Sequence, residues 1–218
     1  YNTNHNKVLS IGNAVPFAIG GFSSRTVQTV VAEGEPVGFI RGYKAVLNPD
    51  NSLKEILPLQ NLGSTLPTAY GNFSLSASYK NLSFMLSGDY QYGAYVHSFD
   101  RQFRFSKGLK DDAIPEKALE GLDQGANWLN FTNFFVEKSD FLKIRNIGIA
   151  YDYKPKKYLK SVNLAFNVYN PFAFTASSVD PEAALAGARS QGAVAVGGLN
   201  YSSYSTPRQY VGTIRVSF

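Results

Sequence analysis

The stretch that decides the fold is the end of the chain, Arg208-Gln-Tyr-Val-Gly-Thr-Ile-Arg-Val-Ser-Phe218. Its residues alternate between two faces, with Tyr210, Gly212, Ile214, Val216 and Phe218 on one and Val211, Thr213, Arg215 and Ser217 on the other. A strand of this kind, about ten residues long and ending on an aromatic residue, is typical of an outer-membrane β-barrel. The edge strand of a soluble sandwich shows the same alternation. The rest of the sequence therefore has to decide.

The composition excludes several classes of protein. The 218 residues contain no cysteine, so neither a disulfide framework nor a thiolate metal site is available. Aromatic residues make up 14%, nearly all of them Tyr and Phe, which favours strands. The net charge is +5, but the basic residues are scattered among acidic ones and no nucleic-acid-binding motif accompanies them. We therefore expect no nucleic-acid partner.

The hydropathy excludes a helical membrane protein. No run approaches the 18 apolar residues that a transmembrane helix needs. Alternating strands, in contrast, average out to an ordinary value, and the mean hydropathy here is −0.17. Residues 1–7 do not have the pattern of a signal peptide, and the sequence does not begin with an initiator Met. We therefore expect it to be part of a longer chain.

Alternating segments predict about eight strands in all. The clearest is a hairpin over Asn72–Tyr95, with its turn at Lys80-Asn81. Asn146–Tyr153 and Val162–Asn170 also alternate, and upstream of Asn146 the phase inverts, which indicates a bulge or a strand that leaves the bilayer. Weaker candidates are Lys7–Gly12, Arg25–Ala32 and Val37–Leu47.

The connections alternate in length. Those predicted to be long are Asn48–Ala69, His97–Ser139 and Phe172–Pro207, and those predicted to be short are Glu33–Pro36, Lys80-Asn81 and Lys154–Lys160. Outer-membrane barrels have long extracellular loops and short periplasmic turns in this rhythm. A band of about 25 Å crossed by tilted strands needs roughly ten residues per strand, in agreement with the segments above. We therefore predict an all-β, antiparallel transmembrane barrel.

Six segments resemble the SusC/RagA-like TonB-dependent outer-membrane transporters of Bacteroidetes. They are Glu33-Gly-Glu-Pro-Val-Gly-Phe-Ile-Arg-Gly-Tyr43, Thr68-Ala-Tyr-Gly-Asn-Phe-Ser-Leu-Ser-Ala-Ser-Tyr79, Phe135-Val-Glu-Lys-Ser-Asp-Phe-Leu-Lys-Ile-Arg-Asn-Ile-Gly-Ile-Ala-Tyr151, Asn167-Val-Tyr-Asn-Pro-Phe172, Val179-Asp-Pro-Glu182 and Ser205-Thr-Pro-Arg-Gln-Tyr210. Each segment alone is weakly specific, and their order and spacing carry the resemblance.

The resemblance implies that residues 1–218 form the C-terminal portion, about eight strands, of a 22-stranded barrel. The plug domain and the TonB box of that family are not in this chain. It further implies import of an oligosaccharide or peptide across the bacterial outer membrane, in contact with membrane lipid. The implied partners are a SusD-like surface lipoprotein, and TonB-ExbB-ExbD through the missing N-terminal part. Pro171 and Phe172 depart from the family's Leu-Phe, and the loop that follows has few aromatics for stacking on sugar, so the substrate stays open.

No constellation in the sequence predicts an enzyme or a cofactor. The only histidines, His5 and His97, are far apart and have no carboxylate at metal-ligand spacing, so we expect no metal site. The acids Asp111-Asp112 and Asp180-Pro-Glu182 match no calcium loop, and we expect them to be solvated.

The loop His97–Ser139 supplies the candidate ligand contacts, which are Arg101, Arg104, Asn127, Trp128 and Asn130. The alternative, which we favour, is that its aromatic residues Trp128, Phe131, Phe134 and Phe135 anchor the loop to the barrel rim within an aromatic girdle.

The candidates for the lumen are Asp89, Gln91, Lys143, Arg145 and Arg215. The cations among them either line the lumen or pair with Asp89 or Asp152. Tyr210 and Phe218 are the candidate barrel-assembly signal.

Two other architectures make distinct predictions. A small self-contained outer-membrane barrel with an adhesin or structural role requires Lys7–Gly12 to pair with the last strand. A soluble sandwich requires the Phe73/Leu75 and Leu164/Phe166 faces to pack on a second sheet.

Overall fold

The alternating segments of the sequence form one long antiparallel sheet. The computed structural model describes residues 1–21, 27–155, 159–182, 198–200 and 204–218. Its elements are, in order, β1 (Asn2–Thr3), β2 (Phe17–Gly21), β3 (Gln28–Val31), β4 (Phe39–Leu47), β5 (Leu53–Ser64), β6 (Ala69–Tyr79), β7 (Leu82–Tyr92), β8 (Tyr95–Ser98), α1 (Phe99–Ser106), η1 (Glu116–Leu119), α2 (Gln124–Asn127), η2 (Trp128–Phe135), β9 (Val136–Lys138), β10 (Phe141–Tyr153), β11 (Ser161–Thr175), β12 (Leu199–Asn200) and β13 (Gln209–Ser217).

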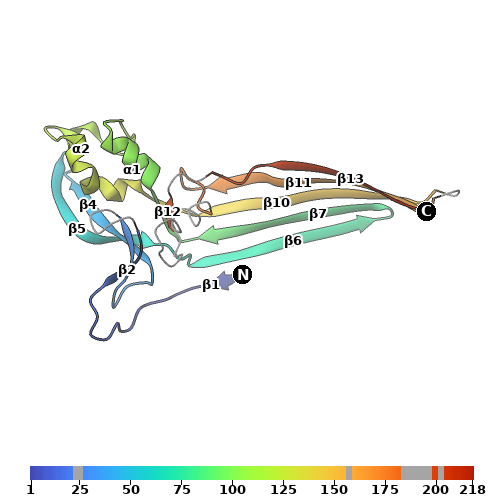
Figure 1. Ribbon diagram of the computed structural model, residues 1–218, viewed down its shortest axis with the longest axis horizontal. Coiled ribbons are helices and arrows are strands. Elements are labelled where there is room, and N and C mark those ends of the chain that lie inside the picture. The colour runs from blue at the N-terminus through green and yellow to red at the C-terminus, as the bar shows by residue number, and fades with distance from the viewer. Residues whose placement is uncertain (22–26, 156–158, 183–197, 201–203) are drawn as a thin grey trace.

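The long strands extend side by side as an arm from a globular end (Figure 1). Within the described residues the sheet has the order β1-β6-β7-β10-β11-β13, so β1 and β13 are its edges and it does not close on itself. The predicted hairpin is confirmed as β6 and β7, and Lys80 in their turn has a φ of +53°. The all-β prediction is confirmed, since most of the chain is antiparallel sheet and the helices are few and short.

A β-bulge interrupts β10 where the sequence changes phase. The register of β10 shifts between Ile144 and Asn146 against both of its neighbours, β7 and β11. One extra residue, Arg145, therefore lies between two regular stretches of β10. From Asn146 onward, side chains point to the opposite face from the one that the alternation before the bulge would assign to them. Of the two explanations that the sequence offered for the inversion, the bulge is confirmed.

Cross-strand pairing aligns the apolar residues into rows that run across the sheet. One row joins Leu75, Leu86, Ile147, Val168 and Tyr210, and the next joins Ala77, Phe84, Ile149, Phe166 and Gly212. Leu75, Phe84, Ile149, Phe166 and Tyr210 in these rows are exposed, Phe166 at 47%, whereas Leu86, Ile147 and Val168 are half-buried. The soluble sandwich required the Phe73/Leu75 and Leu164/Phe166 faces to pack on a second sheet. In the described part of the chain Leu75, Leu164 and Phe166 are exposed and Phe73 is half-buried, so that prediction is wrong there.

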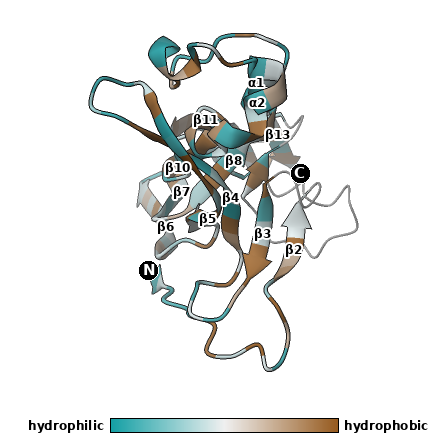
Figure 2. Ribbon diagram, turned by 90° about the vertical axis from the view of Figure 1, so that its left-hand side faces the viewer, coloured by the Kyte–Doolittle hydropathy of each residue, from teal (hydrophilic) through white to brown (hydrophobic). Residues whose placement is uncertain are grey.

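The globular end combines two small sheets with the helices. The sheets have the orders β2-β3-β4-β5 and β12-β8-β9. The main core, formed by Ala45, Phe105, Ile114, Ala118, Phe131 and Phe135, joins β4 to the helical segment. A second core joins Val27, Ile40 and Leu199. Seen from this end, hydrophobic stretches colour β3 and β4 (Figure 2). Among the described residues, none of the helices is long and apolar enough to cross a bilayer.

Three predictions about segments were wrong. Residues 7–11 have no regular structure and no strand spans Lys7–Gly12, so the pairing that a self-contained small barrel requires is absent from the described structure. The predicted long loop Asn48–Ala69 contains β5, which pairs with β4 through three register shifts that hide its alternation in the sequence. His97–Ser139 forms helices and β9 and packs as part of the globular end.

Candidate functional site

Two cations and three carboxylates meet where the sheet joins the globular end. The Lys143 ammonium lies 2.6 Å from Asp180 Oδ1 and 2.6 Å from Glu182 Oε2. Arg145 donates two parallel hydrogen bonds to Asp89, from Nε at 2.6 Å and from Nη2 at 2.8 Å, and it also pairs with Glu182. We refer to these five side chains as the junction cluster.

The two cations lie beside the bulge in β10 and share one carboxylate, Glu182. Lys143 lies directly opposite Asp89 in β7, and the extra residue at the bulge, Arg145, pairs with the same Asp89. Lys143 and Arg145 are two residues apart, so strand alternation already directs them to the same face. The bulge then changes the face of the residues that follow, beginning with Asn146.

The junction cluster links three segments of the chain. Asp89 belongs to β7, the two cations to β10, and Asp180 with Glu182 to the segment that follows β11. The side chain of Lys143 is 5% exposed, and Asp180 is 10% exposed. Removing one member leaves a buried charge without its partner, which is costly in a poorly solvated site. The cluster therefore fixes the start of the segment after β11 against the sheet.

A cavity of about 180 Å³ lies beside the junction cluster. Lys143 and Arg145 line it together with Asn170, Phe172, Ser177 and Thr206. Hydroxyl and amide groups alternate here with an aromatic face, as in sites for small polar ligands. The site brings Asp89, Lys143 and Arg145 together, and the hypothesis that the basic residues pair with Asp89 is confirmed for Arg145.

The other two lumen candidates, Gln91 and Arg215, are not members of the junction cluster. Gln91 donates hydrogen bonds from Nε2 to the carbonyl oxygen and to the hydroxyl of Ser139, at 3.1 and 3.2 Å. Arg215 is exposed on β13, where Asn163 is its cross-strand partner. Asn163 in turn donates to Asp152 at 2.7 Å. Arg215, Asn163 and Asp152 lie near the opposite end of the sheet from the junction cluster, whereas Gln91 is two residues from Asp89 on β7.

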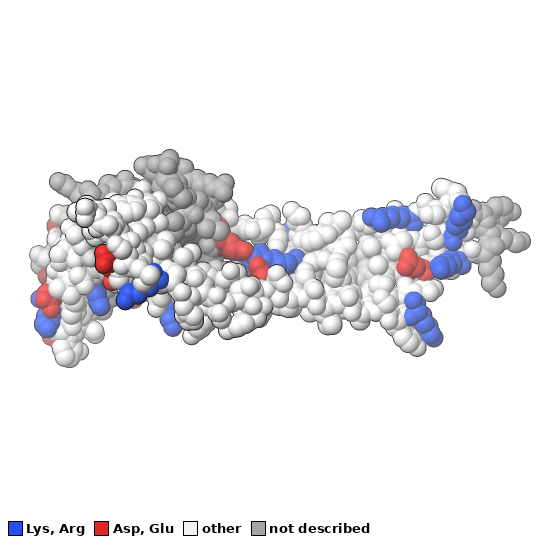
Figure 3. Space-filling model, turned by 90° about the horizontal axis from the view of Figure 1, so that it is seen from below, with Lys and Arg blue, Asp and Glu red and all other residues white. Residues whose placement is uncertain are grey.

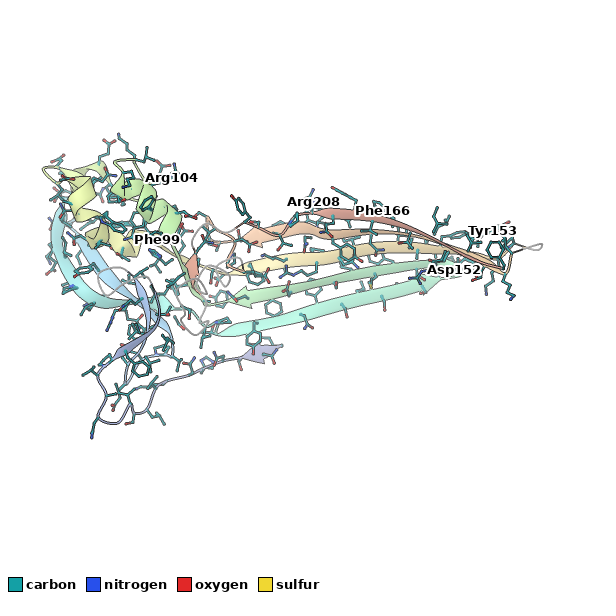
Figure 4. All side chains as sticks on the ribbon, in the orientation of Figure 1. Phe99, Arg104, Asp152, Tyr153, Phe166 and Arg208 are labelled. Carbon is teal, nitrogen blue, oxygen red and sulfur yellow. The ribbon has the colours of Figure 1, made fainter. Side chains whose placement is uncertain are left out.

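The five candidate ligand contacts divide into two groups. Arg101 and Arg104 of α1 line one pocket together with Asp111 and Asp112. Arg104 is exposed, and its position on α1 is marked in Figure 4. Arg101 donates from Nε to Asp111 at 2.9 Å and also pairs with Glu137. Burial by itself would lower the pKa of Arg101, but the hydrogen bonds that it donates to Asp111 and Glu137, and the negative charges of these residues, outweigh burial and raise that pKa.

Asn127, Trp128 and Asn130 form the second group and serve the helical segment itself. Asn130 donates to Asn127 Oδ1 at 3.0 Å, and Trp128 packs edge-on against Phe99 with ring centroids 6.2 Å apart. Trp128 also packs against the main core. The structure therefore brings Arg101 and Arg104 together in one pocket. The other three candidates contact residues of the helical segment and the main core.

The proposed aromatic girdle is wrong for the buried members of the set. Phe131 and Phe135 are fully buried and pack on Phe105, with ring centroids 5.7 and 5.5 Å away. They anchor the helical segment to β4 inside the globular end, where Asn133 Oδ1 also accepts a hydrogen bond from the Ala45 amide at 2.9 Å. A girdle residue would instead have to face lipid at the edge of an apolar band.

The acids near these sites were the residues that the sequence analysis misjudged. We expected Asp111 and Asp180 to be solvated, but each is 10% exposed and ion-paired. Among the described residues no group of three or more acidic or His side chains is arranged to hold a metal ion. The basic residues of β10 and α1 are the signal that could have identified these acids. A basic side chain that is buried requires an acidic partner.

His97 is a buried residue of the globular end. Its Nε2 shares a 2.6 Å hydrogen bond with Gln102 Oε1. Burial lowers the pKa of His97 to about 4, and the nearby Arg101 also lowers it. The imidazole is therefore neutral at neutral pH. It lies 0% exposed among packed side chains, which suits a structural role.

An open antiparallel sheet with an exposed apolar face and a globular end defines the class of fold, and solved structures share it. The chain is similar to chains in the structures of the RagAB peptide importer. For the open-open state the identity is 18% and the TM-score 0.62, over 97% of this chain and 25% of that chain. For the closed-closed state the values are 17% and 0.64, over 96% and 25%.

The chain thus spans about a quarter of the length of the solved chains it matches. The resemblance to RagA-like proteins that the motifs indicated is confirmed at the level of fold. No protein-family model and no curated protein matches this chain.

Proposed function

We propose that this chain is the C-terminal part of the barrel wall of a SusC-like, TonB-dependent importer in the bacterial outer membrane. The observation that carries the proposal is the exposed apolar face of the long sheet. Its rows continue through β6, β7, β10 and β11 to β13, and Leu75, Phe84, Ile149, Phe166 and Tyr210 in them are exposed. Such a face is stable against lipid and unfavourable in water.

The opposite face supports a water-filled lumen. Between the bulge and the β6-β7 turn, this face carries Ser76, Ser78 and Ser83 on the hairpin and Asn163, Asn167 and Thr213 on the last two strands. Strands β6, β7, β10, β11 and β13 have 11, 11, 13, 15 and 9 residues, enough for the roughly ten that a tilted strand needs to cross the apolar band. The open edges at β1 and β13 are where the remaining strands of a larger barrel would pair.

For the cargo we propose a peptide, because the similar solved structures are those of a peptide importer. An oligosaccharide is the other candidate. Arg101 and Arg104 are the proposed contacts at the outer mouth, where the charges in their pocket suit a zwitterionic ligand. A SusD-like lipoprotein would cover this mouth, and TonB-ExbB-ExbD would act through a plug outside this chain. Tyr210 and Phe218 are the proposed barrel-assembly signal.

Two neighbouring cysteine variants test the membrane span. The chain has no native cysteine, so Phe166→Cys and Asn167→Cys each provide a single spin-labelling position. In native membranes we expect the label at 166 to be accessible to oxygen and shielded from a water-soluble nickel chelate, and the label at 167 to behave in the opposite way. Equal access of the chelate to both positions would refute the lipid-facing wall.

Uptake by intact cells tests the cargo. We expect cells that lack the protein to lose energy-dependent uptake of fluorescent peptides of several residues and to retain their uptake of oligosaccharides. The reverse result would assign oligosaccharides, and unchanged uptake of both would refute a role in import.

A further inference from the structure

Exposed basic residues gather at the end of the sheet that is far from the globular end. The connections β6-β7 and β10-β11 and the end of β13 lie there (Figure 1). The basic residues that the structure describes in this stretch are Lys80, Lys154, Lys160 and Arg215, and the one described acid is Asp152. These four basic side chains and one acidic side chain leave a side-chain charge of +3 among the described residues at this end.

The basic residues thus gather in space although they are scattered in the sequence. Figure 3 shows Lys and Arg side chains collected at this end of the molecule. The four that the structure describes, Lys80, Lys154, Lys160 and Arg215, are all exposed. None of the four has an ion-pair partner among the described residues, and Asp152 accepts its hydrogen bond from Asn163. We name these four cations the turn-end patch.

The turn-end patch is continuous with the apolar face. The Lys80 ammonium lies 5.2 Å from the centroid of the Tyr79 ring, and Tyr79 is 72% exposed. Tyr151 and Tyr153 are 44% and 52% exposed at the same end of β10, and Tyr153 is marked in Figure 4. Tyrosine at the margin of an apolar band, followed by lysine, is the order of side chains that crosses from hydrocarbon to headgroup.

We propose that the turn-end patch binds the phosphates of anionic glycerophospholipids in the leaflet on its side of the membrane. The inference rests on the proposed membrane span and adds a lipid class to it. Unpaired ammonium groups beyond an aromatic margin meet lipid phosphates at the depth where these lie, and each lysine near an anionic surface strengthens binding by about fivefold. The tyrosines beside the lysines favour a lipid surface over a small soluble anion, which would contact the charges alone.

The test compares lipid preference in nanodiscs for the full transporter from which this chain comes. Discs contain phosphatidylcholine with a minor fraction of spin-labelled phosphatidylglycerol or spin-labelled phosphatidylcholine. The test variant is Lys80→Gln/Lys154→Gln/Lys160→Gln. The matched control, Lys44→Gln/Lys54→Gln/Lys107→Gln, removes the same charge from exposed positions of the globular end.

We expect the unaltered protein and the control to prefer phosphatidylglycerol at least tenfold, and the test variant to lose most of that preference. Equal binding of the two lipids by the unaltered protein, or an equal loss in the control, would overturn the lipid assignment while the span stands. If added glycerol phosphate, at constant ionic strength, abolishes the preference for phosphatidylglycerol, the patch would be reassigned to free phosphate esters. Failure of the protein to enter the disc would overturn the proposed span and this inference together.

Discussion

Replacing Lys143 with methionine should release the segment after β11 from the sheet. The substitution keeps the length of the side chain and removes an ammonium that is 5% exposed and contacts two carboxylates at 2.6 Å. Asp180, 10% exposed, then loses this ion pair, whereas Glu182 is 33% exposed and keeps Arg145. Breaking a buried pair costs about 3 to 5 kcal/mol. Because Glu182 is partly solvated and keeps a partner, we expect about 2 to 3 kcal/mol, below that range.

Hydrogen exchange measured by mass spectrometry reads this change directly. A loss of 2 to 3 kcal/mol in the local opening free energy speeds exchange roughly 30- to 150-fold for a peptide that covers residues 176–182. The control is Lys54→Met, whose pair with Glu55 is 3.7 Å long and 59% and 48% exposed, so that exchange near residue 54 should change less than twofold. If exchange over 176–182 in the Lys143 variant stays within twofold of the unaltered protein, the junction cluster does not hold this segment.

Three further predictions concern the core, the pH dependence and the sheet. Phe105→Ala, at a 0% exposed position, should cost about 3 to 5 kcal/mol of unfolding free energy, whereas Phe103→Ala, 46% exposed, should cost less than about 1; denaturant titration of the globular end compares them. The pKa of His97 is about 4 when folded and near 6.5 when unfolded, so the unfolded state binds the extra proton and stability falls as the pH drops from about 6.5 to 4; His97→Gln should flatten this slope in pH-dependent melting, and an unchanged slope would contradict the assignment. Gly88→Ala places a Cβ 2.5 Å from a backbone oxygen of β10 and should reduce the yield of folded barrel, while Gly212→Ala has no atom within 4 Å and should leave it unchanged; equal yields would show that the β7-β10 ladder tolerates the contact.

The sequence predicted the long sheet well because its alternation is regular. In β6 and β7, and in β11 as far as Tyr169, each residue faces the side that a period of two assigns, and the phase change at Asn146 located the bulge. The pairing of Arg145 with Asp89 was open to prediction because few acids lie on the sheet at all.

The globular end was less predictable for physical reasons. β5 contains Pro58, and Leu59 has a φ of +54°, so its apolar residues do not follow one period and the strand looks like a loop. Phe131 and Phe135 are aromatic residues in a segment that was predicted to lie at the barrel rim. Their contact with Phe105, which precedes them by more than 20 residues, is visible only in the fold. Asp111 and Asp180 depend on partners from other segments, which no local pattern encodes.

The two ends of the molecule are held together by different forces, and this difference decides how each should respond to its surroundings. The globular end buries Phe105, Phe131 and Phe135 and pairs Arg101 with two carboxylates, so its stability comes from within the chain. The arm buries little on either face and depends on its ladder and on what lies against it. Detergent that replaces lipid should therefore loosen the arm first, and salt should act mainly on the turn-end patch, whose charges are exposed and unpaired within the described structure.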